Sequence, residues 1–224
     1  TPHNPTGGVL TRDDIEAIAD VAREYEDITI LADEIYMRLI YEGEHFSIAS
    51  LPGMAERTIV LDGFSKAYAM TGWRLGYAIV PPQLVEPYSK LIINSVSCTS
   101  SFEQIAAVEA LTGRQDSVDQ MAAEFRARRA LVVEGLNRIP GVRCRMPAGA
   151  FYAFPNVAGT GMDGSQLADK LLYEGGVCVL SGTAFGKTAA DHIRISYANS
   201  QENLRRALER FEEVVSKTPA PAAV

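Results

Sequence analysis

The first part of the chain alternates between a helical pattern and short apolar segments. Apolar residues recur at helical spacing from Ile15 to Ala22, directly after Thr11, which can cap a helix. Three short apolar segments follow, at residues 28–32, 58–61 and 75–80. Strands that are apolar throughout are typical of a sheet covered on both faces, as in α/β proteins. We therefore expect ligands to bind beyond the carboxyl ends of these strands.

From about Gln83 the pattern becomes mainly helical. Ser101 and Gln104 have the spacing of a capping box, which predicts a helix that Gly113 ends. A longer helical pattern covers residues 116–138. Beyond it the pattern predicts strands near 142–146, 151–155, 177–180 and 193–197, and helices near 165–174 and 201–215.

These elements predict two domains joined by a helix. Residues 1–115 form part of a large α/β domain, residues 116–138 a long connecting helix, and residues 139–217 a smaller α+β domain. Residues 218–224 are rich in proline and alanine, and we expect this tail to be disordered.

Composition narrows the class of protein. The net charge is −7, with 28 acidic against 21 basic side chains, which argues against a broad nucleic-acid-binding surface. No apolar run reaches the length of a membrane span. The three cysteines are scattered and suit neither a disulfide framework nor a metal site. We expect a protein of the cytoplasm that binds no metal, nucleic acid or membrane.

Four segments carry side chains that could perform chemistry, at residues 4–7, 33–36, 65–76 and 192–197. Each also has an ordinary structural interpretation. The first reads as a plain turn, and the second as a capping aspartate followed by a half-buried tyrosine. The third contains a lysine that could be solvated, and the fourth an arginine that could lie on an exposed edge strand.

The third and fourth segments are the most informative. Lys66 is one of five lysines and lies between two apolar segments, which makes it a candidate for burial and for Schiff-base chemistry. Arg74 follows eight residues later and could bind a phosphate or carboxylate. Arg194 shares one face of its predicted strand with Ser196, opposite the apolar side chains.

Together these segments resemble the class I/II aminotransferases, the aspartate-aminotransferase-like branch of the fold-type-I pyridoxal-phosphate (PLP) enzymes. The resemblance runs from residue 1 to about 217. It implies a mainly parallel PLP-binding sheet with helices on both faces, a smaller α+β C-terminal domain, and a homodimer. The matching motifs are N-P-T-G at 4–7, D-E-I-Y at 33–36, S-K-A-Y-A-M-T-G-W-R-L-G-Y at 65–77 and R-I-S-Y-A at 194–198, with weaker matches G-A-F-Y at 149–152 and G-T-A-F-G at 182–186.

The resemblance implies a role for each matched residue. Lys66 would form the Schiff base with PLP and carry the proton between the substrate Cα and the cofactor. Arg194 would hold the α-carboxylate of the substrate in a bidentate fork, which orients the Cα–H bond.

Five other residues would contact the cofactor. Asp33, as a buried carboxylate, would pair with the pyridine nitrogen and keep the ring protonated. Tyr36 and Asn4 would hydrogen-bond the phenolic oxygen of the ring. Arg74 would bind the phosphate, with Ser65 as a further candidate contact.

The sequence departs from the family pattern in two places. The family often carries a serine three residues before the lysine, where this chain has Gly63. The N-P-T-G motif, which opens this chain, normally lies well inside the protein. The resemblance therefore implies the C-terminal portion of an enzyme that lacks roughly its first 165 residues. We expect this portion to be inactive by itself.

The expected activity is transfer of an amino group from an amino acid to a 2-oxo acid. A carbon–sulfur lyase or an aminocyclopropane-carboxylate-synthase-like lyase would share every residue named above. Product analysis separates them, because a lyase releases pyruvate, ammonia and a thiol. A non-catalytic effector domain of a transcription regulator is the other alternative, and a helix-turn-helix upstream would support it. The motifs do not specify the amino acid.

Overall fold

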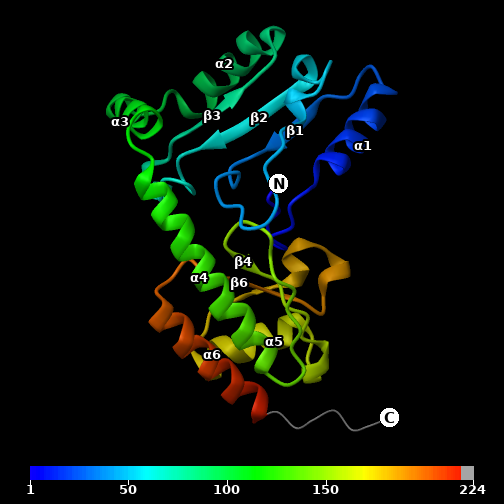
Figure 1. Ribbon diagram of the computed structural model, residues 1–224, viewed down its shortest axis with the longest axis vertical. Helices are drawn as coiled ribbons and strands as arrows, with labels where there is room; N and C mark the ends of the chain where they lie inside the picture. The colour runs from blue at the N-terminus through cyan, green and yellow to red at the C-terminus, as the bar shows by residue number, and fades with distance from the viewer. Residues whose placement is uncertain (218–224) are drawn as a thin grey trace. The chain divides into compact units, whose positions relative to one another are not determined.

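The computed structural model describes residues 1–217, so the tail predicted to be disordered at 218–224 lies outside the described residues. Helices and strands alternate first and a helix-rich part follows (Figure 1). The helices are α1 (Arg12–Arg23), α2 (Pro82–Val96), α3 (Ser101–Thr112), α4 (Asp116–Arg138), α5 (Gly164–Lys170) and α6 (Gln201–Ser216). The strands are β1 (Ile30–Asp33), β2 (Thr58–Gly63), β3 (Gly76–Ile79), β4 (Tyr152–Ala153), β5 (Leu180–Ser181) and β6 (Ile193–Ser196).

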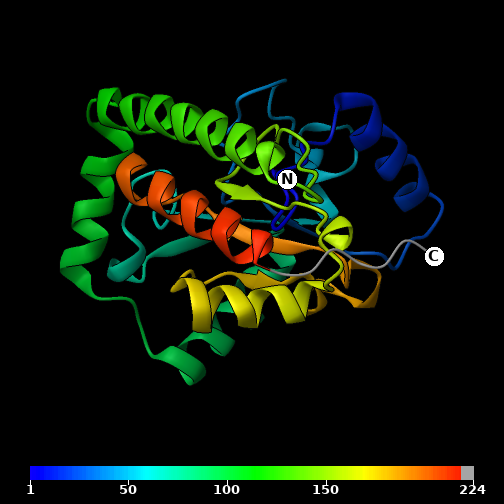
Figure 2. The same cartoon turned by 90° about the horizontal axis from the view of Figure 1, so that it is seen from below.

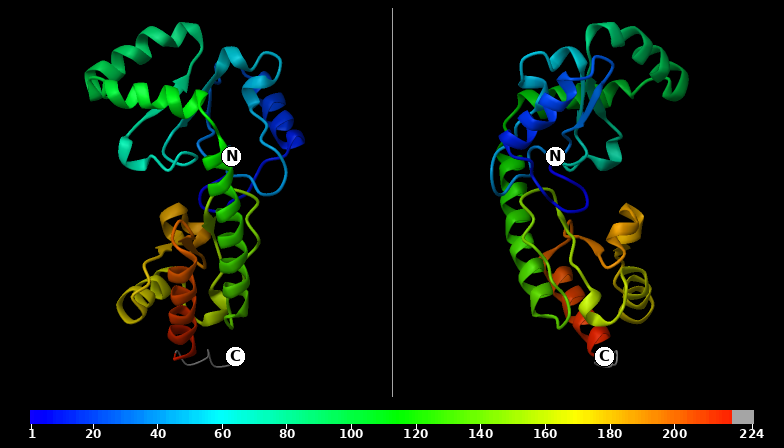
Figure 3. Two further views of the ribbon diagram at one scale, coloured as in Figure 1. Left: turned by 60° about the vertical axis from the view of Figure 1, so that its left-hand side comes forward. Right: turned by 90° about the vertical axis from the view of Figure 1, so that its right-hand side faces the viewer.

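The chain forms two compact units. The first contains residues 1–2 and 9–122, and the second contains residues 3–8 together with residues from 123 onward. The division falls inside α4, which is one unbroken helix in both views of Figure 3. The N-P-T-G turn opens the chain and yet belongs to the second unit.

The sheet of the first unit is mixed, with the strand order β1-β2-β3. Strands β1 and β2 are parallel, whereas β2 and β3 are antiparallel. The predicted sheet was mainly parallel. Residues 64–75, which join β2 to β3, contain no α-helix. A strand that returns without a crossover helix runs antiparallel to the one before it, which explains the difference.

Helix α1 covers one face of β1. A capping box starts the helix, because Thr11 accepts a hydrogen bond from the Asp14 N–H and Asp14 accepts one from the Thr11 N–H. The apolar face of α1 carries Ile15, which packs in one cluster with Ile30 of β1. Leu31 points to the opposite face of the strand, where its side chain is 64% exposed.

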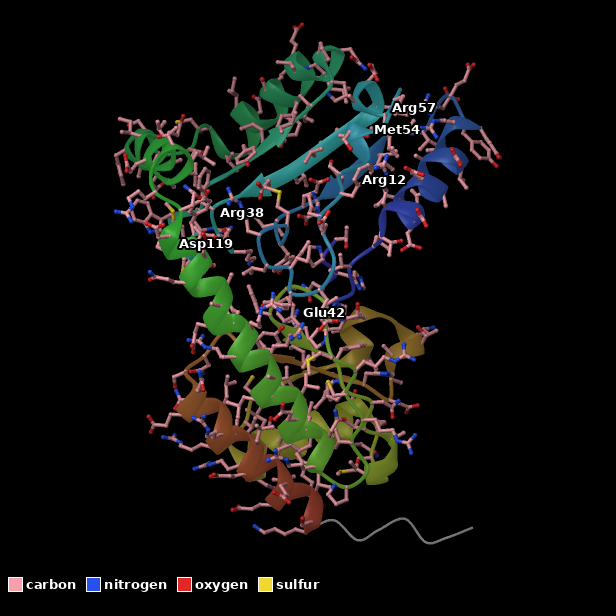
Figure 4. The ribbon with its side chains drawn as sticks, viewed as in Figure 1. Arg12, Arg38, Glu42, Met54, Arg57 and Asp119 are labelled. Atoms are coloured by element: carbon pink, nitrogen blue, oxygen red, sulfur yellow. The ribbon has the colours of Figure 1, made fainter. Side chains whose placement is uncertain are left out.

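Arg57 fixes the end of α1 beside the start of β2 (Figure 4). Its Nη1 donates to the carbonyl oxygens of Ala22 at 2.7 Å and Tyr25 at 2.9 Å. The last carbonyls of a helix have no partner inside the helix, so Arg57 satisfies groups that would otherwise need water. These bonds help to hold β2, whose far end leads to Lys66.

Helix α3 begins differently from the prediction. Ser101 is its first residue, and Ser100 occupies the capping position without a side-chain bond to the helix. The Gln104 amide instead donates to the carbonyl of Thr99 at 2.8 Å, so the predicted capping box is wrong. Gly113 ends the helix as predicted, with its N–H bonded to the Glu109 carbonyl. Helix α4 has the predicted bounds.

Helices α2 and α3 expose many apolar side chains. Leu91 is 69% exposed, Phe102 69% and Ile105 73%. Strand β1, which has Leu31 on its uncovered face, forms an edge of the described sheet. Exposed apolar patches and unpaired edge strands both favour association. We expect residues 1–224, expressed alone, to self-associate, as light scattering can measure; a monodisperse monomer would contradict this.

The second unit is built on an antiparallel sheet with the order β4-β6-β5. The strand predicted at 142–146 reduces to a single bridge between Arg143 and Asn156. The helix predicted at 165–174 is α5 followed by a π-helical turn at Leu171–Gly175. The core residues come from α4, α5, β6 and α6, and include Leu136, Leu167, Ile193, Tyr197 and Phe211.

Helices α4 and α6 lie side by side in the second unit (Figures 1 and 2). A Cβ built on Gly135 would lie 2.5 Å from Cδ1 of Leu208, so glycine is what allows this close approach. Gln201 at the start of α6 also donates to the carboxylate of Glu124. Among the described residues, no helix combines the length and apolar character needed to cross a bilayer.

Candidate active site

Asp33 lies at the carboxyl end of β1, as the sequence predicted for a ligand-binding position. The ladder to β2 continues one residue further, because the Glu34 N–H donates to the Leu61 carbonyl at 2.8 Å. Asp33 itself is exposed, and its Oδ1 accepts only a local bond from the Ile35 N–H at 3.2 Å. This chain therefore does not bury the Asp33 carboxylate as expected. Most of the lone pairs of the carboxylate remain available for hydrogen bonds.

Lys66 and Tyr36 lie close together. The Lys66 Nζ is 5.9 Å from the centroid of the Tyr36 ring, within the range of a cation–π contact. Tyr36 is buried, whereas Lys66 is half-buried in the loop after β2. Lys66 is therefore partly removed from solvent. The structure joins the second and third candidate segments at the carboxyl end of the sheet.

The loop that carries Lys66 is held by local bonds. The Thr71 hydroxyl donates to the Ser65 carbonyl at 2.9 Å, and Nη1 of Arg74 donates to the Thr71 carbonyl at 2.9 Å. The Arg74 side chain is exposed, and its backbone is left-handed with φ +52°. Only part of the guanidinium is used internally, so donors remain for an anion.

Gly63 ends β2 at a close approach of two backbones. A Cβ at this position would lie 2.9 Å from Cα of Gly76 and 3.1 Å from the Leu75 carbonyl oxygen. A serine here would require a backbone shift. The glycine that departs from the commoner family pattern is therefore fixed by the pairing of β2 with β3, and a side-chain contact with phosphate must come from another residue.

Asp62 ends the second apolar segment, but its carboxylate is used within the sheet. Its Oδ2 accepts a 2.6 Å hydrogen bond from the Tyr77 hydroxyl on β3, and its Oδ1 accepts the Gly63 N–H. Burial, together with this bond to Asp62, raises the pKa of Tyr77 well above the ordinary value for a tyrosine. Tyr77 therefore stays protonated and serves as a donor that fixes Asp62.

Arg194 lies on the central strand of the second sheet, so the edge-strand interpretation is excluded. Its guanidinium lies over two aromatic rings, 4.5 Å from the centroid of Tyr152 and 5.1 Å from that of Phe185. Its Nε is buried and has no hydrogen-bond partner within residues 1–217. A guanidinium held between rings with an unused donor is well prepared to bind a carboxylate.

Asn4 contacts Arg194 directly. The Arg194 Nη1 donates to the Asn4 Oδ1 at 2.9 Å, although the two residues are 190 positions apart. The turn that carries Asn4 is closed by bonds between the backbones of His3 and Gly8, and the Gly149 N–H donates to the Gly7 carbonyl. Gly7 has φ +67°, and a Cβ there would lie 2.3 Å from Cβ of Pro147, which explains the glycine.

The predicted site residues thus fall into two groups. The first unit holds five of them: Asp33, Tyr36, Ser65, Lys66 and Arg74. The second unit holds Asn4 and Arg194, which are in contact. Within the first group the structure brings Lys66 to Tyr36, and the shared strand pairing places Asp33 beside the end of β2.

Sequence reasoning missed a buried pair of contacting side chains beside Asp33, Glu34 and His45. Nε2 of His45 lies 2.8 Å from Oε2 of Glu34, and the Glu34 side chain is only 8% exposed. Burial raises the pKa of Glu34, but hydrogen bonds from His45 and Ser47, with the charge of His45, outweigh burial, so the net pKa is lowered. Glu34 belongs to the D-E-I-Y motif, and this was the only signal in the sequence that could have indicated it.

The Glu34–His45 pair predicts an acid-dependent stability. Folding lowers the Glu34 pKa below its ordinary 4.5. The Glu34 carboxylate therefore makes its full contribution to stability above that pH, and this contribution is lost as the pH falls through the pKa of the folded protein. In the complete protein, Glu34→Gln should lower the free energy of unfolding by about 2 kcal/mol at pH 7 and flatten its decline in acid. Urea denaturation at pH 7 and pH 4 measures both effects.

Glu44→Gln is the matched control, since Glu44 is exposed in the same loop and the substitution removes the same charge. It should change stability by less than about 0.5 kcal/mol. Equal losses in the two variants would show that Glu34 contributes through net charge and not through its bond to His45.

Comparison with known proteins identifies the family. The profile of the family described as aminotransferase class I and II matches residues 1–211. The chain is 43% identical over 220 residues to aromatic-amino-acid aminotransferase 2 of Thermococcus litoralis, covering 97% of this chain and 56% of that protein. It is also 43% identical over 218 residues to an aspartate aminotransferase of Pyrococcus abyssi, covering 96% of this chain and 56% of that protein.

Solved structures give the same result. The aspartate aminotransferase from Rhizobium meliloti superimposes with a TM-score of 0.92 at 37% identity, over 98% of this chain and 57% of that one. The aromatic aminotransferase from Pyrococcus horikoshii superimposes with a TM-score of 0.93 at 43% identity, over 97% of this chain and 58% of that one. The chain belongs to the class I and II aminotransferases and has the mixed sheet and helices of fold type I. It spans just over half the length of these relatives.

Proposed function

We propose that the protein containing this chain is a PLP-dependent amino-acid aminotransferase that transfers an amino group from an amino acid to a 2-oxo acid. The observation that carries the proposal is Lys66, a half-buried amine beside the Tyr36 ring, in a segment that matches the family motif through Arg74. Relatives named as aspartate and aromatic-amino-acid aminotransferases support it.

The residues of the first unit fit PLP by their chemistry. Lys66 supplies an amine that can hold the aldehyde carbon of the cofactor, and Arg74 has guanidinium donors left for its phosphate. Asp33 has carboxylate lone pairs left for a protonated ring nitrogen, with Tyr36 as a neighbouring donor. When bound, PLP acts as an electron sink for negative charge that develops at the substrate Cα.

Arg194 would hold and orient the amino-acid substrate. A guanidinium and a carboxylate pair through two parallel hydrogen bonds, which fixes both the position and the plane of the carboxylate. The rings of Tyr152 and Phe185 restrict the guanidinium, and Asn4 holds Nη1, so little freedom is lost on binding. Orientation of the substrate in this way aligns its Cα–H bond for proton removal.

Lys66 would move the proton. An amine that takes a proton from Cα must be neutral when it acts, and a half-buried position beside an aromatic ring keeps water from competing for it. Asp33 and Tyr36 would keep the cofactor ring in a fixed orientation relative to this amine. In this assignment Lys66 is the catalytic residue, and Asn4 positions Arg194.

We also propose that the complete protein is a cytoplasmic homodimer. Helices α2 and α3 expose apolar side chains that a second subunit, or further chain of the complete protein, would cover, and this exposure supports the proposal. Sedimentation of the complete protein tests the dimer.

The proposed activity is tested by assaying the complete protein against a panel of amino donors with 2-oxoglutarate. Formation of glutamate and the matching 2-oxo acid in equal amounts is the expected result. Release of pyruvate and ammonia without a new amino acid would assign a lyase instead. No turnover with any donor, together with no binding of PLP, would overturn the proposal.

A further inference from the structure

A cavity of about 560 Å³ lies in the second unit, beside three neighbouring extended segments. Arg143 and Asn156 exchange both backbone hydrogen bonds, at 2.9 and 2.8 Å, and Asn156 is bridged to His192 on its other side. Residues directly opposite one another in antiparallel pairs project from the same face. Arg143, Asn156 and His192 therefore form one row, and all three line the cavity.

The opposite face of these segments belongs to the core. Val142, Val157 and Ile193 alternate with the row and are buried in the main apolar cluster of the second unit, as is Cys144, which also borders the cavity. The cavity therefore lies on the outer side of three bridged segments whose other side packs on the core. Its volume lies in the range of sites for small molecules.

The cavity carries two positive charges without a counter-charge. Arg143 and Arg145 lie two residues apart on one segment and both line it. Neither guanidinium has a hydrogen bond or ion pair to another of residues 1–217, and no carboxylate lines the cavity. Both arginines are exposed, so their charged groups are accessible to an anion from solvent.

The unused hydrogen-bonding groups of the cavity include the Arg143 and Arg145 guanidinium groups, the Asn156 amide and Nδ1 of His192, which is buried without a partner within residues 1–217. The Asn137 side chain bonds the backbone of Cys144 through one N–H and through Oδ1, at 2.9 and 2.8 Å. The Thr6 hydroxyl is engaged by His3 and by the Gly8 N–H. Asn156 accepts the Ala158 N–H through Oδ1, which leaves its amide NH₂ unused. Guanidinium groups have no acceptor atoms, so Arg143 and Arg145 add only donors.

One wall of the cavity is flat and apolar. The His192 and Phe154 rings stack with their centroids 5.0 Å apart and their planes 16° from parallel. Phe154 also makes an edge contact with Phe185, which fixes the stack. A wall of this kind suits the carbon skeleton of a small organic molecule, while the arginines suit its charged group.

We infer that this cavity binds a small anion carrying a carboxylate or phosphate group, held by Arg143, Arg145 and the Asn156 amide. Arg194 does not line the cavity, so the anion site uses other arginines than the one proposed for the carboxylate fork. The inference goes beyond the proposed function and does not depend on it. An anion bound here would make charge-assisted contacts with both arginines.

Calorimetric titration of the complete protein, loaded with PLP, tests the inference. Sodium phosphate and sodium succinate are the probes, at constant ionic strength in a buffer free of other polyvalent anions. We expect saturable binding of at least one of them, and the tighter probe identifies the charged group that the site prefers. The double variant R143Q/R145Q should raise Kd at least about tenfold, because both charged donors are lost.

Arg138→Gln is the matched control, because Arg138 is an exposed arginine on α4 outside the cavity. It should change Kd by less than about twofold. Protection of Arg143 and Arg145 from phenylglyoxal by the same anion, located by mass spectrometry, is the second expected result. Absence of saturable binding for both probes, or binding that R143Q/R145Q leaves unchanged, would overturn the proposal.

Discussion

Replacing Lys66 by alanine is expected to abolish amino transfer in the complete protein, with a loss in kcat on the order of 10⁴-fold or more. The substitution removes both the amine that holds the cofactor and the base that moves the Cα proton. The fold should change little, because Lys66 is half-buried and its contact with Tyr36 is a weak one at 5.9 Å. Steady-state kinetics and circular dichroism measure the two parts of this prediction.

Borohydride reduction identifies the lysine independently of activity. Reduction of the protein with bound PLP should attach the pyridoxyl group to Lys66, which peptide mass spectrometry can locate. Lys90→Ala is the control, since Lys90 is an exposed lysine of α2 and its loss should leave turnover unchanged. A pyridoxyl group on Lys90 or Lys187 would show that the assignment to Lys66 is wrong.

The helices of this chain could be predicted where the signal is local. Thr11 and Asp14 form the capping box of α1 within four residues of each other, and α4 has the bounds that its apolar spacing predicts. The capping box at Ser101 failed, because Ser100 takes the capping position and the Gln104 amide bonds to Thr99. A spacing of serine and glutamine permits a cap but does not decide which residue starts the helix.

The strands could be predicted less accurately than the helices, because the pairing of a strand depends on residues far away in the sequence. The segment at 142–146 has the alternation of a strand and yet makes only the bridge at Arg143, since a sheet position also needs a neighbour in register. The antiparallel return of β3 likewise follows from the connection at residues 64–75, which contains no α-helix.

The candidate site could be named from motifs, but its contacts could not. Lys66, Asp33 and Arg194 were chosen from residue type and position, and their environments required the fold. The bond between Arg194 and Asn4 joins positions 190 apart, and the Glu34–His45 pair joins a strand end to a loop that carries no motif. Asn4 was expected to contact only the cofactor, and its bond to Arg194 adds a positioning role.

Substitution of Arg194 by lysine is expected to lower kcat/KM by roughly 30- to 1,000-fold, which corresponds to about 2–4 kcal/mol. Lysine keeps the charge but loses the planar fork, and it also loses the stacking on Tyr152 and Phe185 that holds the guanidinium in place. The loss should appear largely in KM, because the carboxylate contact is made when the substrate binds. The absorbance of bound PLP should change little.

Two further variants separate orientation from charge. Arg205→Lys is the control, because it makes the same substitution at an exposed arginine of α6. It should leave kcat/KM unchanged. Asn4→Ala should raise the substrate KM in the wild-type background and have little further effect on KM in Arg194→Lys, because Asn4 acts on substrate binding by holding Nη1 of that arginine. If Arg194→Lys released PLP while the substrate KM stayed the same, Arg194 would be a cofactor ligand. Additive losses in the double variant would instead show that Asn4 acts independently of Arg194.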